Sequence, residues 1–403
     1  MSVPETSRAM ACGCGLSTRA DTADALAEAL AQAASGLQGP ADLAILLFSG
    51  EHVEAAETLA RQARRQLAHA VVLGASAEGV IAGSRELDEP PALVVWLARW
   101  PGVQLVPMQL KFQRTPEGGV LEGWPDALMG PWPAGSFLLV LGDPFSFPAE
   151  LLLERLNEDR PGVAAVGGMA SAAPEPGGNR LILQDRVLDE GAVVLHVSGP
   201  VRLATLVSQG CRPIGRPLVV TRAERNILYE LGGKPALAQL RELFQTLPTS
   251  EQRLVQRALH VGRVVSEYKD RFEQGDFLIR NVVGIDPSSG AIAVGDYFRP
   301  GQTVQFHVRD EEAADAELKQ LLASAQQRLV QPPAGGLLFT CNGRGRRMFS
   351  HPDHDAAAVR RVWPDLPLAG FFAQGEVGPV GPHNFLHGFT ASLALFLPGD
   401  GQV

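Results

Sequence analysis

The chain has 403 residues, which is longer than a single hydrophobic core usually supports, so its length predicts two domains. Its formal net charge of -9 argues against nucleic acid or an anionic membrane as the main partner, because both would select a basic face. The sequence contains no apolar run of membrane-spanning length and no signal peptide, and its 4 cysteines are too few for a disulfide framework, so we expect a cytosolic protein.

The first 40 residues predict a flexible tail followed by one helix. Residues 17–21 carry capping side chains, and Ala23, Leu26 and Leu30 then recur at helical spacing. The Cys12-Gly13-Cys14 motif has no second Cys or His pair nearby, which favours a place in the tail over a metal site.

Three later segments resemble one another, and each reads as strand, helix, strand and glycine-rich loop. They occupy residues 43–79, 137–172 and 335–376. Their loops share one pattern, which is Gly, two variable residues, Ala, a polar residue and a small residue, at residues 74–79, 167–172 and 370–375. Internal self-similarity of this kind predicts a fold built from related units.

The remaining segments fill in the predicted architecture. Residues 180–188 and 192–197 predict a hairpin, residues 237–244 and 251–259 two helices, residues 311–329 a long helix and residues 389–396 a closing strand. We therefore expect an α/β protein of two domains, built from related strand-helix-strand units on mixed, largely parallel sheets. The predicted boundaries are a tail and helix at residues 1–40, a first domain at 41–225 and a second at 226–397.

A ligand site is predicted where the third unit's strands end. Strands joined by a helix are normally parallel neighbours, so residues 341–346 and 370–381 should line one hollow at the same sheet edge. Arg344 can bind a carboxylate, Glu376 an ammonium group, and Asn342 and Gln374 neutral groups, which suits a small polar ligand such as an amino acid. The full predicted ligand-binding set is Cys341, Asn342, Arg344, Gln374, Glu376, Asn384 and His387. On this hypothesis Glu376→Ala weakens ligand binding and leaves the unfolding midpoint nearly unchanged.

Several of these motifs resemble the FIST family, named for F-box and intracellular signal transduction. The C-terminal half of that family is matched by residues 339–345 (FTCNGRG), 370–379 (GFFAQGEVGP) and 384–392 (NFLHGFTAS), and its N-terminal half by residues 74–79, 142–145, 167–171 and 208–215. The resemblance covers about residues 41–396. It implies a sensory module for small ligands such as amino acids, found alone or attached to signalling or F-box partners.

Other interpretations of the same residues remain open. Cys341 can act as the nucleophile of a thiol enzyme, with His383 or His387 as its base, or it can be a small buried hydrophobic residue. The chain can also be a scaffold for a signalling protein. Residues 351–355 (HPDHD) suggest either metal ligands or a helix cap, and the glycine loops either contact a ligand or allow tight packing. No metal or cofactor is predicted, because no loop matches a P-loop or dinucleotide motif.

Overall fold

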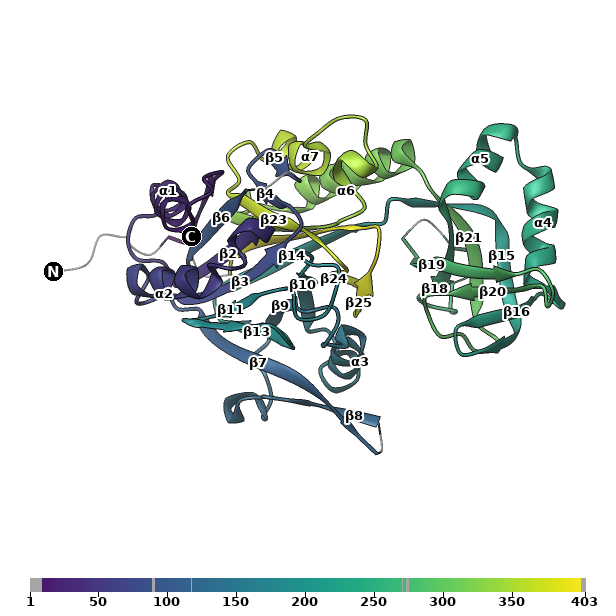
Figure 1. Ribbon diagram of the computed structural model, residues 1–403, viewed down its shortest axis with the longest axis horizontal. Helices are drawn as coiled ribbons and strands as arrows, with labels where there is room; N and C mark the ends of the chain where they lie inside the picture. The colour runs from purple at the N-terminus through teal and green to yellow at the C-terminus, as the bar shows by residue number, and fades with distance from the viewer. Residues whose placement is uncertain (1–8, 89–90, 117, 270, 273–274, 400–403) are drawn as a thin grey trace. The chain divides into compact units, whose positions relative to one another are not determined.

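The computed structural model describes residues 9–88, 91–116, 118–269, 271–272 and 275–399 (Figure 1). The chain forms two compact units. Unit 1 contains residues 1–207, 320–386 and 390–403, and unit 2 contains residues 208–319 and 387–389. The domain boundary predicted near residue 225 falls inside unit 2.

Unit 1 is built on three sheets. The first has the strand order β1 (Ala11–Ser17), β6 (Leu93–Arg99), β2 (Leu43–Ser49), β3 (Val71–Ala77), β11 (Leu181–Leu183) and β12 (Arg186–Leu188). The second runs β25 (His383–His387), β24 (Glu376–Val380), β10 (Ala164–Met169), β9 (Phe137–Gly142), β13 (Ala192–Ser198), β7 (Gln104–Thr115) and β8 (Gly118–Glu122). The third runs β14 (Val201–Ser208), β26 (Ala391–Pro398), β22 (Gly335–Cys341), β23 (Leu368–Ala373), β4 (Val80–Ala82) and β5 (Arg85–Leu87).

Each of these sheets contains one parallel strand pair. The pairs are β2–β3, β9–β10 and β22–β23, and each is joined by a helix as predicted, namely α2 (Ala56–Gln66), α3 (Ala149–Asp159) and α7 (His354–Val362). The neighbouring strands are antiparallel, so the prediction of largely parallel sheets was wrong. Parallel pairing needs a crossover helix, and the flanking strands arrive through short turns or from distant segments that impose no parallel direction.

The central strands of the first two sheets are apolar on both faces because each of these sheets lies between two cores. In β2, Leu43, Ile45 and Leu47 face a core shared by the three sheets, while Ala44, Leu46 and Phe48 face the helices α1 (Thr22–Ala34) and α2. Helix α2 in turn buries Ala56, Leu59, Ala60 and Ala63, which lie on one face at helical spacing. This two-sided burial explains the uninterrupted apolar runs in the sequence.

Two local predictions in unit 1 were wrong. Cys12 and Cys14 lie in β1, which pairs with β6 along its whole length, and not in a tail; residues 1–8 of the predicted tail lie outside the described residues. Likewise, β11 forms its hairpin with β12, whereas β13 lies in another sheet between β9 and β7. The strand that pairs with β1 and the strands that pair with β13 are distant from them in sequence, so local patterns did not reveal these pairings.

Unit 2 contains a closed antiparallel barrel. The ring runs β15 (Cys211–Glu224), β21 (Thr303–Arg309), β18 (Leu259–Val264), β19 (Phe277–Asp286), β20 (Ala291–Val294) and β16 (Ile227–Leu231), and β16 pairs again with β15. The short strand β17 (Lys234–Pro235) extends from β16. Ring closure removes exposed strand edges, and the interior holds apolar side chains such as Val261, Ile292 and Phe306.

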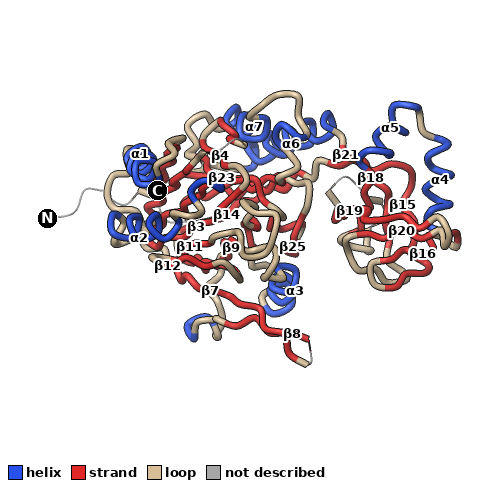
Figure 2. The backbone as a smooth tube through the Cα atoms, viewed as in Figure 1, coloured by secondary structure: helices blue, strands red, loops and turns tan. Residues whose placement is uncertain are grey.

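The predicted helices of the C-terminal half are confirmed. They are α4 (Ala236–Thr246) and α5 (Thr249–Ala258), which lie beside the barrel strands in Figure 2, and α6 (Glu311–Arg328). The limit between the two units, at residues 319–320, falls within α6. Among the described residues, no helix is both long and apolar enough to cross a membrane.

Candidate functional site

The three repeated loops meet in unit 1. The parallel pairing of β22 with β23 places Cys341 opposite Ala373, and the Asn342 N–H donates to the Ala373 carbonyl at 2.9 Å. The carboxyl ends of β22 and β23 therefore lie side by side, as predicted for the two strands of the third unit.

Hydrogen bonds join this loop to the other two. Ser171, from the second repeat, accepts from the Glu78 N–H of the first repeat at 2.9 Å and donates to the Phe372 carbonyl of the third. The Gln374 N–H donates to the Met169 carbonyl at 3.0 Å, and the Ser171 N–H to the Ser76 carbonyl at 3.2 Å. The residues at the polar position of the repeated pattern, Glu78, Ser171 and Gln374, thus connect the three units by hydrogen bonds.

The first glycine of each repeat lies on the second parallel strand, against a carbonyl oxygen of the first. A Cβ at Gly167 or Gly370 would lie 1.9 Å from the oxygen of Val140 or Leu338, and a Cβ at Gly74 2.6 Å from that of Leu46. No side chain fits at such distances. These glycines serve close strand packing, which is the alternative that the sequence left open.

A cavity of about 200 Å³ opens beside the converging loops. It is lined by side chains and backbone from the first and third repeats and from the segment after β5: Glu78, Gly79, Asp88, Asn342, Arg344, Arg347 and Phe372. Two carboxylates and two guanidinium groups therefore surround a small volume, with one aromatic ring.

An ion pair lies at this cavity between Arg347 and Glu78. Arg347 Nη1 is 3.1 Å from Glu78 Oε2, and the same nitrogen donates to the Asn342 carbonyl at 2.8 Å. The side chains are 60% and 35% exposed, so water competes with the pair and it contributes little to stability. The Glu78 hydrogen bond raises the pKa of Arg347, which therefore stays charged.

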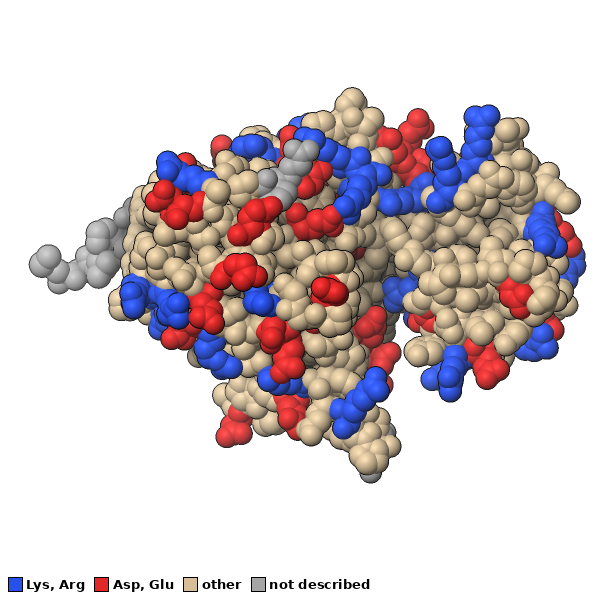
Figure 3. Space-filling view, in the orientation of Figure 1, with Lys and Arg blue, Asp and Glu red and all other residues tan. Residues whose placement is uncertain are grey.

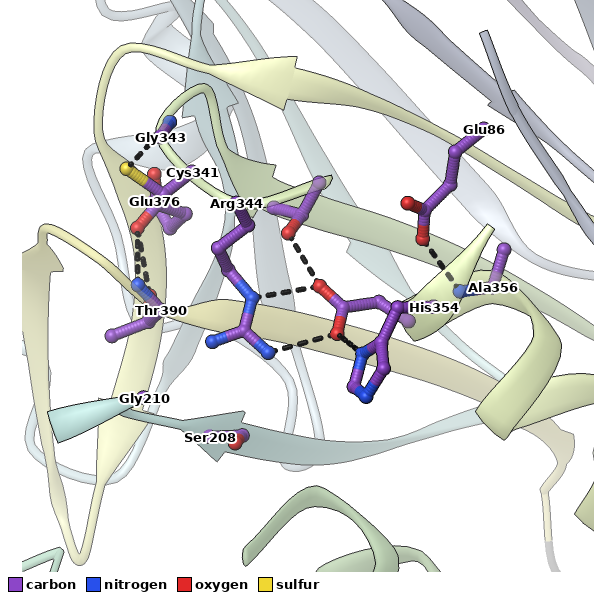
Figure 4. Close-up of polar contacts among 12 residues, drawn as sticks. Glu86, Ser208, Gly210, Cys341, Gly343, Arg344, His354, Ala356, Glu376 and Thr390 are labelled. Carbon is purple, nitrogen blue, oxygen red and sulfur yellow. Dashed lines mark hydrogen bonds and ion pairs between the residues drawn. The ribbon is translucent and has the colours of Figure 1, made fainter. Parts of the chain in front are cut away.

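Arg344, by contrast, is buried and engaged in a bidentate ion pair. Its Nε and Nη2 donate to Asp355 Oδ2 and Oδ1 at 2.7 and 2.8 Å, and both side chains are almost fully buried. Asp355 also accepts from Thr340 Oγ1 at 2.8 Å and lies 2.8 Å from His354 Nδ1. Figure 4 shows the Arg344 guanidinium and the His354 ring in this cluster. The motif HPDHD thus supplies the counterion of Arg344.

Three buried carboxyl groups near this cluster differ in their pKa. Burial alone would raise the pKa of Asp355, but the charge and hydrogen bonds of Arg344 outweigh it and hold the pKa below its ordinary range. Burial, reinforced by the charge of Asp355, raises the pKa of Glu86 to about 7. Burial raises the pKa of Glu376 to about 8, against two hydrogen bonds that Thr390 donates to its Oε2. Asp355 is thus ionised at neutral pH, whereas Glu376 is mostly protonated.

The other predicted site residues lie outside the cavity lining. Cys341 is 7% exposed, and its sulfur accepts from the Gly343 N–H at 3.5 Å (Figure 4). Glu376 is fully buried, and Gln374 is exposed. His387 is buried at the end of β25 and groups with unit 2.

Asn384 has a structural place in β25. It accepts from the Ala165 N–H at 2.7 Å, donates to the Val163 carbonyl at 2.8 Å and exchanges hydrogen bonds with Asn157 of α3. These bonds occupy both atoms of its amide group. They fasten β25 to the segment that joins α3 and β10.

Five cavity residues were missing from the predicted set: Glu78, Gly79, Asp88, Arg347 and Phe372. Glu78 occupies the same position of the repeat as Gln374, so the self-similarity could have suggested it. Arg347 follows the quoted FTCNGRG motif by two residues, and Gly345 shapes its turn with φ +55°; a Cβ there would lie 2.8 Å from the Phe372 ring. Nothing in the local sequence pointed to Asp88. Within the described ranges, no group of three or more His, Cys, Asp or Glu residues is arranged to hold a metal ion.

Comparison with known proteins confirms the family resemblance over most of the chain. Residues 42–234 match the FIST N domain and residues 236–379 the FIST C domain. The uncharacterized protein Rv0628c of Mycobacterium tuberculosis is 46% identical over 390 residues, covering 96% of this chain and 100% of the relative. The uncharacterized protein Mb0898c of Mycobacterium bovis is 42% identical, covering 96% and 99%. Human F-box only protein 22 is 35% identical over 111 residues, covering 24% of this chain and 27% of that protein.

Proposed function

Since the chain belongs to the FIST family, whose domains are associated with signal transduction, we propose that it is a cytosolic sensory module that binds a small polar ligand such as an amino acid. The ligand site is the cavity beside the repeated loops of unit 1. The observation that carries the proposal is that this cavity holds opposite charges on its wall, with Glu78 and Asp88 near Arg347.

The size of the cavity restricts the class of ligand. Its volume of about 200 Å³ is below the roughly 300 to 1,000 Å³ of typical pockets for drug-sized ligands. A metabolite with a few heavy atoms fits this volume, whereas a nucleotide does not. A zwitterion would use both signs of charge on the wall.

Arg347 and Glu78 are the residues that we expect to contact such a ligand most directly. Their mutual ion pair is partly exposed, so separating it costs on the order of 1 kcal/mol or less. An amino acid that enters between them replaces one ion pair with two, because its carboxylate binds Arg347 and its ammonium group binds Glu78.

Arg344 and Glu376 then have a supporting role. The guanidinium of Arg344 is already bound by Asp355, so Arg344 fixes the loop that carries Asn342 and Arg347. Glu376, which does not line the cavity, holds Thr390 beside the third repeat. The competing thiol-enzyme hypothesis lacks comparable support, because the Cys341 side chain is 7% exposed.

A thermal-shift screen over the proteinogenic amino acids tests the proposal, with isothermal titration of any amino acid that raises the melting temperature. A ligand at a hundred times its Kd stabilises the folded state by about 2.7 kcal/mol. We expect Arg347→Met and Glu78→Gln to weaken binding at least tenfold, or about 1.4 kcal/mol. Their own melting temperatures should stay close to that of the wild type, because the pair is exposed.

Arg361→Met is the matched control, since Arg361 is an exposed arginine on α7 outside the cavity lining. It should leave binding unchanged. If no amino acid stabilises the wild type, or if Arg347→Met binds as tightly as Arg361→Met, the proposed site is wrong.

A further inference from the structure

Unit 2 carries an apolar groove between its two helices and its barrel strands. The groove has a volume of about 510 Å³ and lies where α4, α5 and β19 come together. Its apolar lining consists of Leu240, Phe244, Val255, Leu259, Val282 and Ile285.

This lining is only partly covered by the protein itself. Leu240 and Val255 are buried in the core of unit 2, but Phe244 and Val282 are half-buried and Ile285 is 44% exposed. Apolar side chains held open in one groove are available to a partner, because covering them removes apolar surface from water.

The charged side chains at the groove are basic. Arg241 and Arg257 line it, and Arg253 precedes Arg257 by one turn of α5. Figure 3 shows blue side chains gathered over α5. No Asp or Glu is among the lining residues.

These three arginines have no ion-pair partner within the part of the chain that the structure describes. The nearest carboxylates on the same helices are bound elsewhere: Glu242 pairs with Lys234, and Glu251 pairs with Arg212. The positive charge of these arginines is therefore available to acidic side chains of a partner.

We propose that this groove binds an acidic amphipathic helix of a partner protein. Apolar side chains spaced i, i+3 or i+4, and i+7 along the partner enter the groove, and Asp or Glu side chains on the flanks pair with Arg241 and Arg257. A groove between two helices and a strand suits a helix packed against them. The groove belongs to unit 2 alone, so this inference does not depend on the ligand cavity of unit 1.

Fluorescence anisotropy with three labelled peptides tests the proposal on the full chain. The first peptide is helical, with leucines on one face and glutamates on both flanks. The second replaces each glutamate by lysine, and the third keeps the composition of the first but scatters the leucines around the helix. We expect the first peptide to bind at least tenfold more tightly than either of the others, and its affinity to fall as salt is added.

Variants of the chain separate the groove from unspecific charge attraction. Arg241→Glu combined with Arg257→Glu should weaken binding of the first peptide at least tenfold, and Ile285→Asp should weaken it as well. Arg299→Glu, at an exposed arginine of unit 2 outside the groove, should leave it unchanged. All of these positions are exposed, so the melting temperatures of the variants should stay near that of the wild type. A loss of affinity then reports on the groove and not on unfolding of the variant.

Three results of the binding experiments would overturn the inference. They are equal binding of the glutamate and lysine peptides, equal binding of the peptide with scattered leucines, and an equal loss of affinity in Arg299→Glu. A concentration-dependent dimer in sedimentation equilibrium that Arg257→Glu dissociates would also overturn it, because the occupant would then be a second copy of the chain.

Discussion

Arg344 and Asp355 show how far a single residue can differ in role from what its type suggests. A free arginine after a strand end is a natural ligand for carboxylates, but here the carboxylate comes from the same chain, 11 positions further on. Their side chains are 0% and 1% exposed, so removing either partner would leave a buried charge at a cost of about 3 to 5 kcal/mol. Sequence could supply the arginine and the aspartate, but not their pairing.

Glu376 gives a prediction about pH. Its pKa is raised to about 8 in the folded state, from an ordinary value of 4.5, so the folded state holds a proton that the unfolded state releases above the lower value. The stabilising contribution of the protonated form is complete below 4.5 and is lost as pH rises towards 8, with a slope of at most about 1.4 kcal/mol per pH unit. Glu376→Gln cannot ionise, so its free energy of unfolding should fall less steeply over this range.

Urea unfolding from about pH 5 to about pH 8 measures this difference. Glu57→Gln, at an exposed carboxylate of α2, is the control and should follow the wild-type curve. Parallel curves for wild type and Glu376→Gln would contradict the prediction. The buried position also changes the expectation for Glu376→Ala, which should now lower the unfolding midpoint, because it leaves Thr390 without its acceptor.

Among the elements of this fold, the strand-helix-strand unit is the one that the sequence predicts most clearly. An apolar run, an amphipathic helix and a second apolar run are local features, and a helix that joins two consecutive strands favours a parallel pair with a right-handed crossover. The repeated glycine is equally local in origin, because a glycine within an apolar strand indicates close backbone approach. The antiparallel neighbours of each pair were not predictable in this way.

The repeated glycines predict a large and position-specific effect on stability. In Gly370→Ala the new Cβ would lie 1.9 Å from the Leu338 oxygen, so β22 and β23 must separate, at a cost of about 3 kcal/mol or more. Gly130→Ala is the matched control, because nothing lies within 4 Å of a Cβ at that position. Chemical unfolding of the two variants checks the prediction, which fails if both lose the same stability.

At the scale of the whole molecule, the two units have separate hydrophobic cores. Phe306 lies in the barrel core of unit 2, and Phe339 lies in the core shared by the three sheets of unit 1. No described residue belongs to both of these clusters. Units with separate cores are expected to unfold in separable steps.

Differential scanning calorimetry of Phe306→Ala and Phe339→Ala tests this expectation. Each substitution should cost about 3 to 5 kcal/mol within its own unit and shift one transition while leaving the other in place. Hydrogen exchange should show the added opening in the barrel strands for the first variant and in β22 for the second. A single transition that both variants shift equally would mean that the chain unfolds as one cooperative body.

Local periodicity in the sequence accounts for the strand-helix-strand units, the main helices and the glycine-rich junctions, since each is recognised from residues that are neighbours along the chain. The closure of the barrel, the pairing of β1 with β6, the counterion of Arg344 and the lining of the cavity became clear only from the folded chain. Barrel closure, the β1–β6 pair and the cavity join segments far apart along the chain, and the Arg344–Asp355 pair, although only 11 positions apart, depends on how the chain between them folds. The same side chains would satisfy local rules equally well with other partners.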